Sequence, residues 1–439
     1  MKRLLAAACL LPAAAFSAAF SAAFSAAFAQ DTTRVQGVRI GLTYAPGTRP
    51  GVFIAPIAGT GADADSARTI LARDLDFSDR LTVIAPDGGD APAGALNYLL
   101  YAQLGAAAVV QASVTPTGSL HVAVHDVAGA KVITVVDVPL PSPALGAEWR
   151  RAVHGVSDEV ERAITGERGI AGTRILFVRD ETLWTVDSDG AVAVPVLGVG
   201  NARSPAWHPT GRFIAYQQFA ENGHHTVAVR DFAGGPARHF TGRGFLNGAP
   251  TFSPDGRTLV FGSGEDGIDL YAADPFGTEA PRRLTVGRGT QSYQPTFRPD
   301  GQRIAYTSNL PGHPEVYITD ADGTNADLLT SSGMGEQSYR SDPDWSPDGR
   351  KVAYQSMTNG GFQIMTINVR DQSVQALTSE GSNEEPSWAP DGRHLVFTST
   401  RSGVKQLWVL DTESGRTRQL TRGARARMPS WSPRLDAAR

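Results

Sequence analysis

The second half of the chain repeats one pattern of apolar and polar positions. Each copy opens with an aromatic residue in a short extended run, continues with a turn of the Ser-Pro-Asp-Gly type, and then has a β-branched and aromatic run. Pro and Gly favour a tight reversal because Pro fixes φ and Gly permits positive φ. Successive copies start 43 to 48 residues apart, at Pro205, Pro250, Pro295, Pro343, Pro386 and Pro429.

Each period predicts four short strands. In one copy the second strand is expected at 303–306 and the third at 315–320, and a short fourth strand ends at Leu329-Thr330. Four strands in a period near 45 residues are typical of a β-propeller blade, whereas a helical solenoid would show helical periodicity. We therefore predict a propeller at 173–435.

The two ends of the repeat array complement each other. Residues 174–178 and 182–187 match the second and third strands but have no opening element, and the last copy at Pro429 is an opening element with nothing after it. The array then makes five whole blades and a sixth built from both ends. Such closure removes the exposed sheet edges that recruit other chains.

The residues before the repeats predict a small α/β domain at 51–165. Apolar runs predict strands at 52–57, 81–84, 107–114, 120–126 and 131–138, and helices are expected around 67–75 and 95–104. Gly166 and Gly169 suit a helix stop at the start of a linker, 166–172. A closing helix is predicted by one apolar face, which comprises Trp149, Val153, Val156, Val160 and Ile164.

The amino terminus resembles a secretory signal. Residues 1–29 have Lys2 and Arg3, then an apolar run, then a small-x-small site at 27–29. A membrane anchor and a lipoprotein modified at Cys9 are the alternatives. Since Cys9 is the single cysteine, the mature chain has no disulfide if the leader is removed.

A polar segment, 30–50, follows the leader. It is rich in Gly and Pro around one apolar run, Val38, Arg39 and Ile40. We expect a flexible amino-terminal arm, and the alternatives for its role are a disordered tail and a docking segment.

Composition and motifs exclude several functions. The formal charge of −4, or −6 once Lys2 and Arg3 are removed, gives no basic excess for nucleic acid. The chain has no phosphate-binding loop, no nucleophile elbow and no His-Glu-x-x-His motif. His224-His225 and the Asp-rich turns at 187–190 and 320–323 lack further metal ligands. We predict no catalytic site, cofactor or metal.

The loops before the first strand of each blade should meet on one rim of the central channel. Unlike the strands, they differ from copy to copy, and their Tyr, Phe, Arg and Met residues suit a protein interface. We take Arg340, Asp342, Glu384 and Arg427 as partner-binding candidates. The alternative is that these segments are only connecting loops.

Taken together, the leader, the α/β domain and the Pro-x-Trp-Ser-Pro-Asp-Gly repeats resemble the TolB family of Tol-Pal systems. The resemblance implies a periplasmic binding protein without catalysis, which docks the lipoprotein Pal on the propeller and TolA through the amino-terminal arm, for outer-membrane integrity and constriction during division. Carried over by position, Pal binding falls on Leu246, Asn247, Ala249 and Tyr293, and TolA binding on Val38, Arg39 and Ile40. This sequence departs from the family in the Gly-rich surroundings of the arm and in Leu246, where a polar residue is common. We expect a monomer that does not span a membrane once mature.

Two other functions remain open at this stage. A propeller hydrolase or lyase acting on a periplasmic polymer would need His, Arg and acidic side chains converging on one rim, and its candidates are Arg340, Asp342, Glu384 and Arg427. A scaffold for a different envelope complex is the third hypothesis.

Overall fold

The computed structural model describes residues 49–59, 62–85, 96–220, 223–287, 289–330, 339–358 and 360–435. All of them belong to one compact unit of the chain, Leu42–Arg439.

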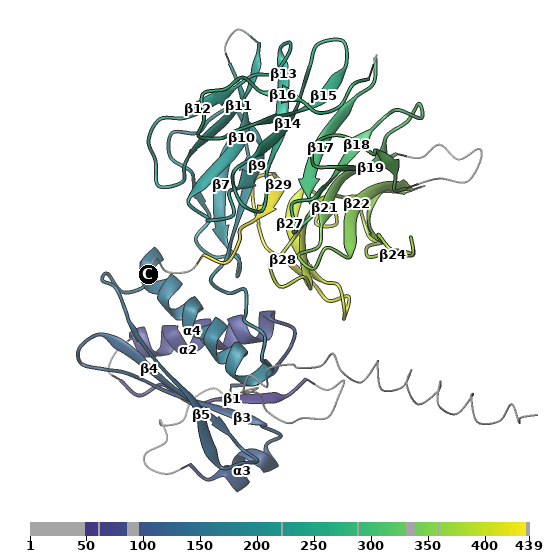
Figure 1. Ribbon diagram of the computed structural model, residues 1–439. Helices are drawn as coiled ribbons and strands as arrows, with labels where there is room; N and C mark the ends of the chain where they lie inside the picture. Colours follow the sequence, from purple (N-terminus) through teal and green to yellow (C-terminus); the bar gives the residue numbers. More distant parts are fainter. Residues whose placement is uncertain are drawn as a thin grey trace, which may run out of the picture. The chain divides into compact units, whose positions relative to one another are not determined.

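A five-stranded sheet with helices on it forms the amino-terminal domain, in the strand order β2-β1-β3-β4-β5. β1 is parallel to β2 and β3, whereas β3, β4 and β5 are antiparallel. Helices α2 and α4 lie on one face of the sheet (Figure 1). The elements are β1 (Gly51–Ile54), α2 (Ala62–Phe77), β2 (Thr82–Ile84), α3 (Tyr98–Gln103), β3 (Ala108–Val114), β4 (Ser119–Asp126), β5 (Lys131–Pro139) and α4 (Ala147–Thr165).

The closing helix α4 forms for the reason that its pattern predicts. All five residues of the expected apolar face are buried in the core of this domain. The helix ends at Gly166, which has a left-handed φ of 83° and donates its N–H to the carbonyl of Arg162 at 2.9 Å. Glycine reaches this conformation without a Cβ clash, so the predicted helix stop is confirmed.

Six four-stranded antiparallel sheets form the propeller blades, and the predicted fold class is confirmed (Figure 1). Blades 1 to 3 comprise β29 (Ala426–Trp431), β6 (Arg174–Arg179), β7 (Thr182–Asp187) and β8 (Val194–Pro195); β9 (Ala202–Trp207), β10 (Phe213–Phe219), β11 (His225–Asp231) and β12 (Arg238–Phe240); and β13 (Leu246–Phe252), β14 (Leu259–Gly264), β15 (Ile268–Ala273) and β16 (Arg282–Arg283). Blades 4 to 6 comprise β17 (Ser292–Phe297), β18 (Arg303–Ser308), β19 (Glu315–Asp320) and β20 (Asp327–Leu328); β21 (Arg340–Trp345), β22 (Lys351–Thr358), β23 (Gly361–Asn368) and β24 (Val374–Ala376); and β25 (Asn383–Trp388), β26 (His394–Ser399), β27 (Gln406–Asp411) and β28 (Thr417–Gln419).

Blade 1 joins the two ends of the array. The last strand β29 pairs with the first propeller strand β6, with Trp431 opposite Ile175 and Ala426 opposite Arg179. The indole N–H of Trp431 donates to the Thr173 hydroxyl at 2.8 Å. The predicted closure is therefore confirmed, because the last strand of the array supplies the first strand of blade 1.

The repeated Ser-Pro-Asp-Gly motif is a turn between the first and second strands. In blade 5 the Ser346 hydroxyl donates to Asp348 at 2.5 Å and accepts from the N–H of Lys351 at 2.9 Å. Asp348 also accepts from the N–H of Arg350 at 3.0 Å, and Gly349 takes a φ of 69°. Ser346 and Asp348 thus satisfy backbone groups of their own turn, which explains why the motif recurs without forming a site.

None of the helices in the described ranges combines the length and apolar character that crossing a membrane requires.

Candidate docking face and channel mouth

A β-bulge interrupts the first strand of every blade at the same place. The residue before the strand's Pro has a positive φ, between 45° and 57°, although none of the six is glycine. This conformation is uncommon for residues with a Cβ, and a bulge often serves to redirect a side chain. The six bulge residues are Ser204, Ala249, Gln294, Asp342, Glu385 and Met428.

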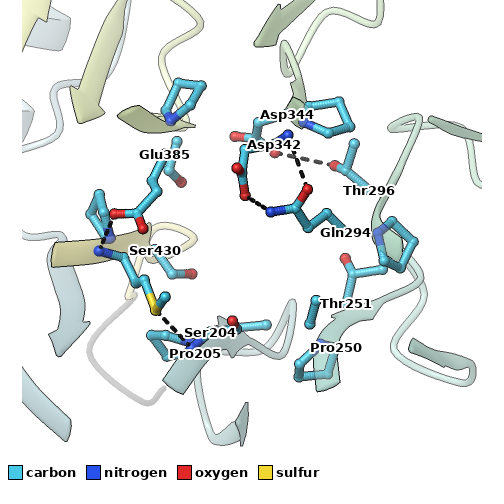
Figure 2. Close-up of a pocket in the computed structure, with 18 residues that line it drawn as sticks. Ser204, Pro205, Pro250, Thr251, Gln294, Thr296, Asp342, Asp344, Glu385 and Ser430 are labelled. Atoms are coloured by element: carbon cyan, nitrogen blue, oxygen red, sulfur yellow. Dashed lines mark hydrogen bonds between the residues drawn. The ribbon is translucent and has the colours of Figure 1, made fainter. Parts of the chain in front are cut away.

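The six bulge residues surround the central channel. They line a cavity of about 200 Å³, to which each blade contributes three residues. Figure 2 shows Ser204, Gln294, Asp342 and Glu385 around this cavity. The Pro of each first strand follows the bulge residue in the lining. A second ring completes the lining and consists of Ala206, Thr251, Thr296, Asp344, Ser387 and Ser430.

Bulge side chains connect consecutive blades. The Gln294 side-chain oxygen accepts from the N–H of Asp342 at 3.2 Å, and Glu385 accepts from the N–H of Met428 at 2.7 Å. The Met428 sulfur in turn accepts from the N–H of Ser204 at 3.5 Å. These contacts join blades 4 and 5, 6 and 1, and 1 and 2, so this part of the mouth is organised before anything binds to it.

Three carboxyl groups give the channel an acidic side. Burial and, after it, the neighbouring Glu385 charge raise the pKa of Asp342 to about 7. Burial also raises the pKa of Asp344 to about 7, against hydrogen bonds from the N–H of Trp388 at 2.7 Å and the hydroxyl of Thr296 at 3.1 Å. The charge of the mouth therefore changes near neutral pH.

We expect Asp342→Asn to stabilise the protein at pH 8 and not at pH 4. The folded pKa lies above the ordinary value of 3.8, so ionising Asp342 costs stability as the pH rises from about 4 to about 7. The amide removes that cost, and the gain should be on the order of 1 kcal/mol after solvent screening. Thermal melts at the two pH values measure it. The exposed turn residue Asp371, changed to Asn, is the control, and an equal gain there would contradict the assignment.

The candidates around Leu246 occupy three different environments. Leu246 opens β13 and is half-buried, whereas Asn247 is only 2% exposed. The Asn247 amide donates to the carbonyl of His225 at 2.8 Å and accepts from the N–H of Gly242 at 2.9 Å. Asn247 therefore holds the loop before β13, and Ala249 reaches the channel as a bulge residue.

Tyr293 and Arg340 lie beside the acidic side of the mouth. Tyr293 is half-buried, and burial followed by the nearby Tyr339 hydroxyl raises its pKa. Arg340 donates to both carboxylate oxygens of the buried Glu315, at 2.9 and 3.1 Å. Its guanidinium is thus engaged within blades 4 and 5.

The adjacent acids of blade 6 go to different places. Glu384 binds Lys405 at 2.5 Å, whereas Glu385 lines the channel. Arg427 pairs with Glu181 of the closing blade. In the described part of the chain, the four candidates Arg340, Asp342, Glu384 and Arg427 have separate partners rather than one convergent cluster. Val38, Arg39 and Ile40 lie outside the described residues.

We define the docking face as the end of the propeller at which the six inner strands begin. Because neighbouring strands are antiparallel, the loops before the first strand and between the second and third strands open at this end. Large apolar side chains are exposed on these loops, with Leu197 at 82% and Val286 at 83%. The Phe and Tyr residues of these loops were expected at an interface, whereas Leu197, Val286 and Val404 were not, and the signal that could have found these three is apolar residues inside loops. The set comprises Leu197, Phe245, Val286, Leu310, Tyr339 and Val404 on the loops, and Met357 near the end of β22.

One group of three possible metal ligands exists among the described residues, and it lies away from the channel. It consists of Asp74, His154 and Asp189. Asp189 already pairs with the guanidinium groups of Arg73 and Arg150. A divalent cation would meet two fixed positive charges there, so we interpret the group as an ion-pair cluster.

Comparisons with known proteins agree on one family. Residues 161–435 match the family model described as the TolB beta propeller domain. A Tol-Pal system protein TolB from Methylococcus capsulatus is 32% identical over 212 residues, which cover 45% of this chain and 49% of that protein. The TolB of Polaromonas naphthalenivorans is 33% identical over 244 residues, 52% of each chain. The chain thus spans about half the length of these curated relatives.

A solved structure matches over more of the chain. The crystal structure of TolB from Acinetobacter baumannii has a TM-score of 0.74 and 26% sequence identity. The match covers 89% of this chain and 98% of that one.

Proposed function

This chain belongs to the TolB family, and from that premise we propose that it is a non-catalytic periplasmic adaptor of a Tol-Pal system. It would bind Pal on the docking face of the propeller and TolA through the amino-terminal arm at Val38, Arg39 and Ile40. In this role it would support outer-membrane integrity and envelope constriction during division. Its relatives carry the name of Tol-Pal system proteins.

The observation that carries the proposal is the chemistry of the docking face. Leu197, Val286 and Leu310 are exposed on loops of the end of the propeller at which hydrogen bonds join bulge residues of neighbouring blades. Monomeric soluble proteins rarely expose grouped large apolar side chains unless they bind something. A rigid mouth surrounded by apolar anchors suits a folded protein partner better than a small substrate.

Pal would contact the mouth and the loops beside it. Leu246 and Tyr293 are half-buried at the start of adjacent inner strands, and Ala249 lines the channel between them. The acidic residues Asp342 and Glu385 would receive polar or basic groups of the partner.

Val286→Asp should weaken Pal binding at least tenfold. An aspartate at an apolar anchor must be desolvated in the complex, and loss of a central anchor costs on the order of 2 kcal/mol. Titration of purified mature protein with soluble Pal by calorimetry measures the affinity. Val374→Asp is the matched control, because Val374 is also an exposed valine, at 55%, but lies on the outermost strand β24.

The control should stay within about twofold of the unchanged protein. Equal losses from both substitutions, or no Pal binding at micromolar protein, would contradict docking on this face. A synthetic peptide of residues 30–50 tests the second contact separately, since it should bind TolA with the propeller absent.

A further inference from the structure

The junction between the α/β domain and the propeller is built from charges rather than from an apolar core. Among the described residues, no hydrophobic cluster contains side chains of both the α/β domain and the propeller. The linker residue Ile170 packs with the propeller. The two domains therefore share hydrogen bonds and ion pairs, which can separate without exposing a large apolar surface.

A buried histidine of blade 6 bridges two carboxylates across this junction. His394 Nδ1 lies 2.7 Å from Asp391 of its own turn, and Nε2 lies 3.3 Å from Asp79, in the turn after α2. His394 is 0% exposed and Asp79 3%. Both contacts are attractive only when the imidazole carries both protons, because a carboxylate is an acceptor.

A second histidine makes the same arrangement from the opposite side. His154 of α4 has Nδ1 2.7 Å from Asp74 of α2 and Nε2 3.7 Å from Asp189, in the turn after β7 of the propeller. Arg150 reaches the same Asp189 oxygen at 2.7 Å, and Arg73 also pairs with it. Each domain thus presents a histidine to a carboxylate of the other.

Other charged groups surround His394 and its two carboxylate partners. Arg49, before β1, lies 3.7 Å from Asp79. Arg80, after α2, contacts Glu161 of α4 at 3.4 Å and Asp391 at 3.9 Å. Arg416, beside β28, contacts Asp79 at 3.0 Å. The half-buried Arg418 of β28 also acts on the charge of His394, and its guanidinium stacks on Phe77. Arg393 donates to the Asp79 carbonyl at 2.9 Å.

We propose that this junction is a pH-sensitive latch, in which protonated His394 holds the α/β domain to blade 6 and its deprotonation releases the two domains. The latch is separate from the docking face, so this proposal does not depend on whether Pal binds there.

The direction of the pH effect follows from the groups around the imidazole ring of His394. Burial alone would lower the pKa of His394, but the hydrogen bonds to Asp391 and Asp79 and the charge of Asp391 raise it to about 9. The contribution of His394 is therefore complete below about pH 6.5 and is lost as the pH rises through about 9. Burial raises the pKa of Glu161 to about 8, so the same rise in pH adds a negative charge nearby. Both changes weaken the junction in alkaline solution.

Fluorescence energy transfer across the junction tests the latch. The pair Thr117→Cys and Ser402→Cys places one dye on an exposed turn of each domain, in a mature chain that otherwise has no cysteine. We expect transfer in this protein to change between pH 7 and pH 10, with a midpoint between about pH 8 and 9. Far-ultraviolet circular dichroism at each pH should stay constant, because the domains remain folded.

Two substitutions should move the midpoint in opposite directions. His394→Gln removes the charge, so its transfer at pH 7 should already match the alkaline value, whereas Glu161→Gln should raise the midpoint. His239→Gln, at an exposed histidine of β12, is the matched control and should leave the midpoint unchanged. A flat transfer signal from pH 6 to 10, a His394→Gln curve that coincides with the control, or loss of sheet signal along with transfer would overturn the proposal.

Discussion

Trp431→Ala should lower the free energy of unfolding by about 3–5 kcal/mol, the usual cost of truncating a buried Trp. Trp431 is 6% exposed and packs with Ile175 and Val186, and its indole N–H donates to Thr173 at 2.8 Å. The truncation leaves a cavity in the one blade whose strands come from both ends of the propeller. Urea denaturation measures the loss of stability.

Closure itself is tested by a matched tryptophan. Trp388 occupies the same repeat position in blade 6 and is also 6% exposed, but its strand β25 pairs with β26, the next strand in sequence. Trp388→Ala should cost similar stability and leave amide exchange in β6 and β29 slow. Trp431→Ala should raise exchange in both strands together, since each protects the other. A rise confined to β29, or a cost below about 1 kcal/mol, would show that the ring does not depend on this contact.

The propeller could be predicted because its information is local and repeated. Turn residues and strand patterns recur in each copy. Because the first copy lacks its first strand and the last copy has only that strand, the simplest closure pairs the two ends, and β29 and β6 form this pair. The closing helix α4 was equally accessible, since its apolar face and Gly166 both lie within one segment of sequence. When local preferences agree with the global fold in this way, the fold can be predicted from one sequence.

The channel mouth was only partly accessible, because its geometry contradicts local preference. A positive φ is expected at glycine, yet the bulge residues include Gln294, Asp342, Glu385 and Met428. The bulge repeats in all six blades although the residue type differs. The positive φ is therefore imposed by the propeller architecture and not by the preference of the residue. The hydrogen bonds between consecutive bulge residues appear only once six blades are placed around an axis.

The junction between the domains left no local signal. The segment 187–190 is typical of a hairpin turn, and that expectation describes its backbone. Its Asp189 nevertheless meets Arg73, Arg150 and His154, which are distant in sequence. Ion pairs between two domains depend on how their folded surfaces meet. Hydrophobic periodicity predicts individual helices and strands and carries no information on such contacts.

Arg340→Ala should cost about 3 kcal/mol of stability, because it leaves the Glu315 carboxylate buried without its guanidinium partner. Glu315 is 1% exposed, and Arg340 supplies two hydrogen bonds to it. Urea denaturation of this variant measures the effect, and Pal titration on the folded fraction measures binding separately. Arg212→Ala is the control, since its pair with Asp231 is 70% exposed on the arginine side and should change stability little.

The rescue of this variant separates a structural role of Arg340 from a docking role. Changing Glu315 to Gln as well removes the buried charge, so the double variant Arg340→Ala, Glu315→Gln should regain most of the lost stability, with a large coupling energy in the double-mutant cycle. If Arg340 serves only to neutralise Glu315, Pal affinity returns with the stability. If Arg340 also contacts Pal, the rescued protein stays weak in binding. Absence of coupling between the two substitutions would contradict the ion pair as the source of the loss.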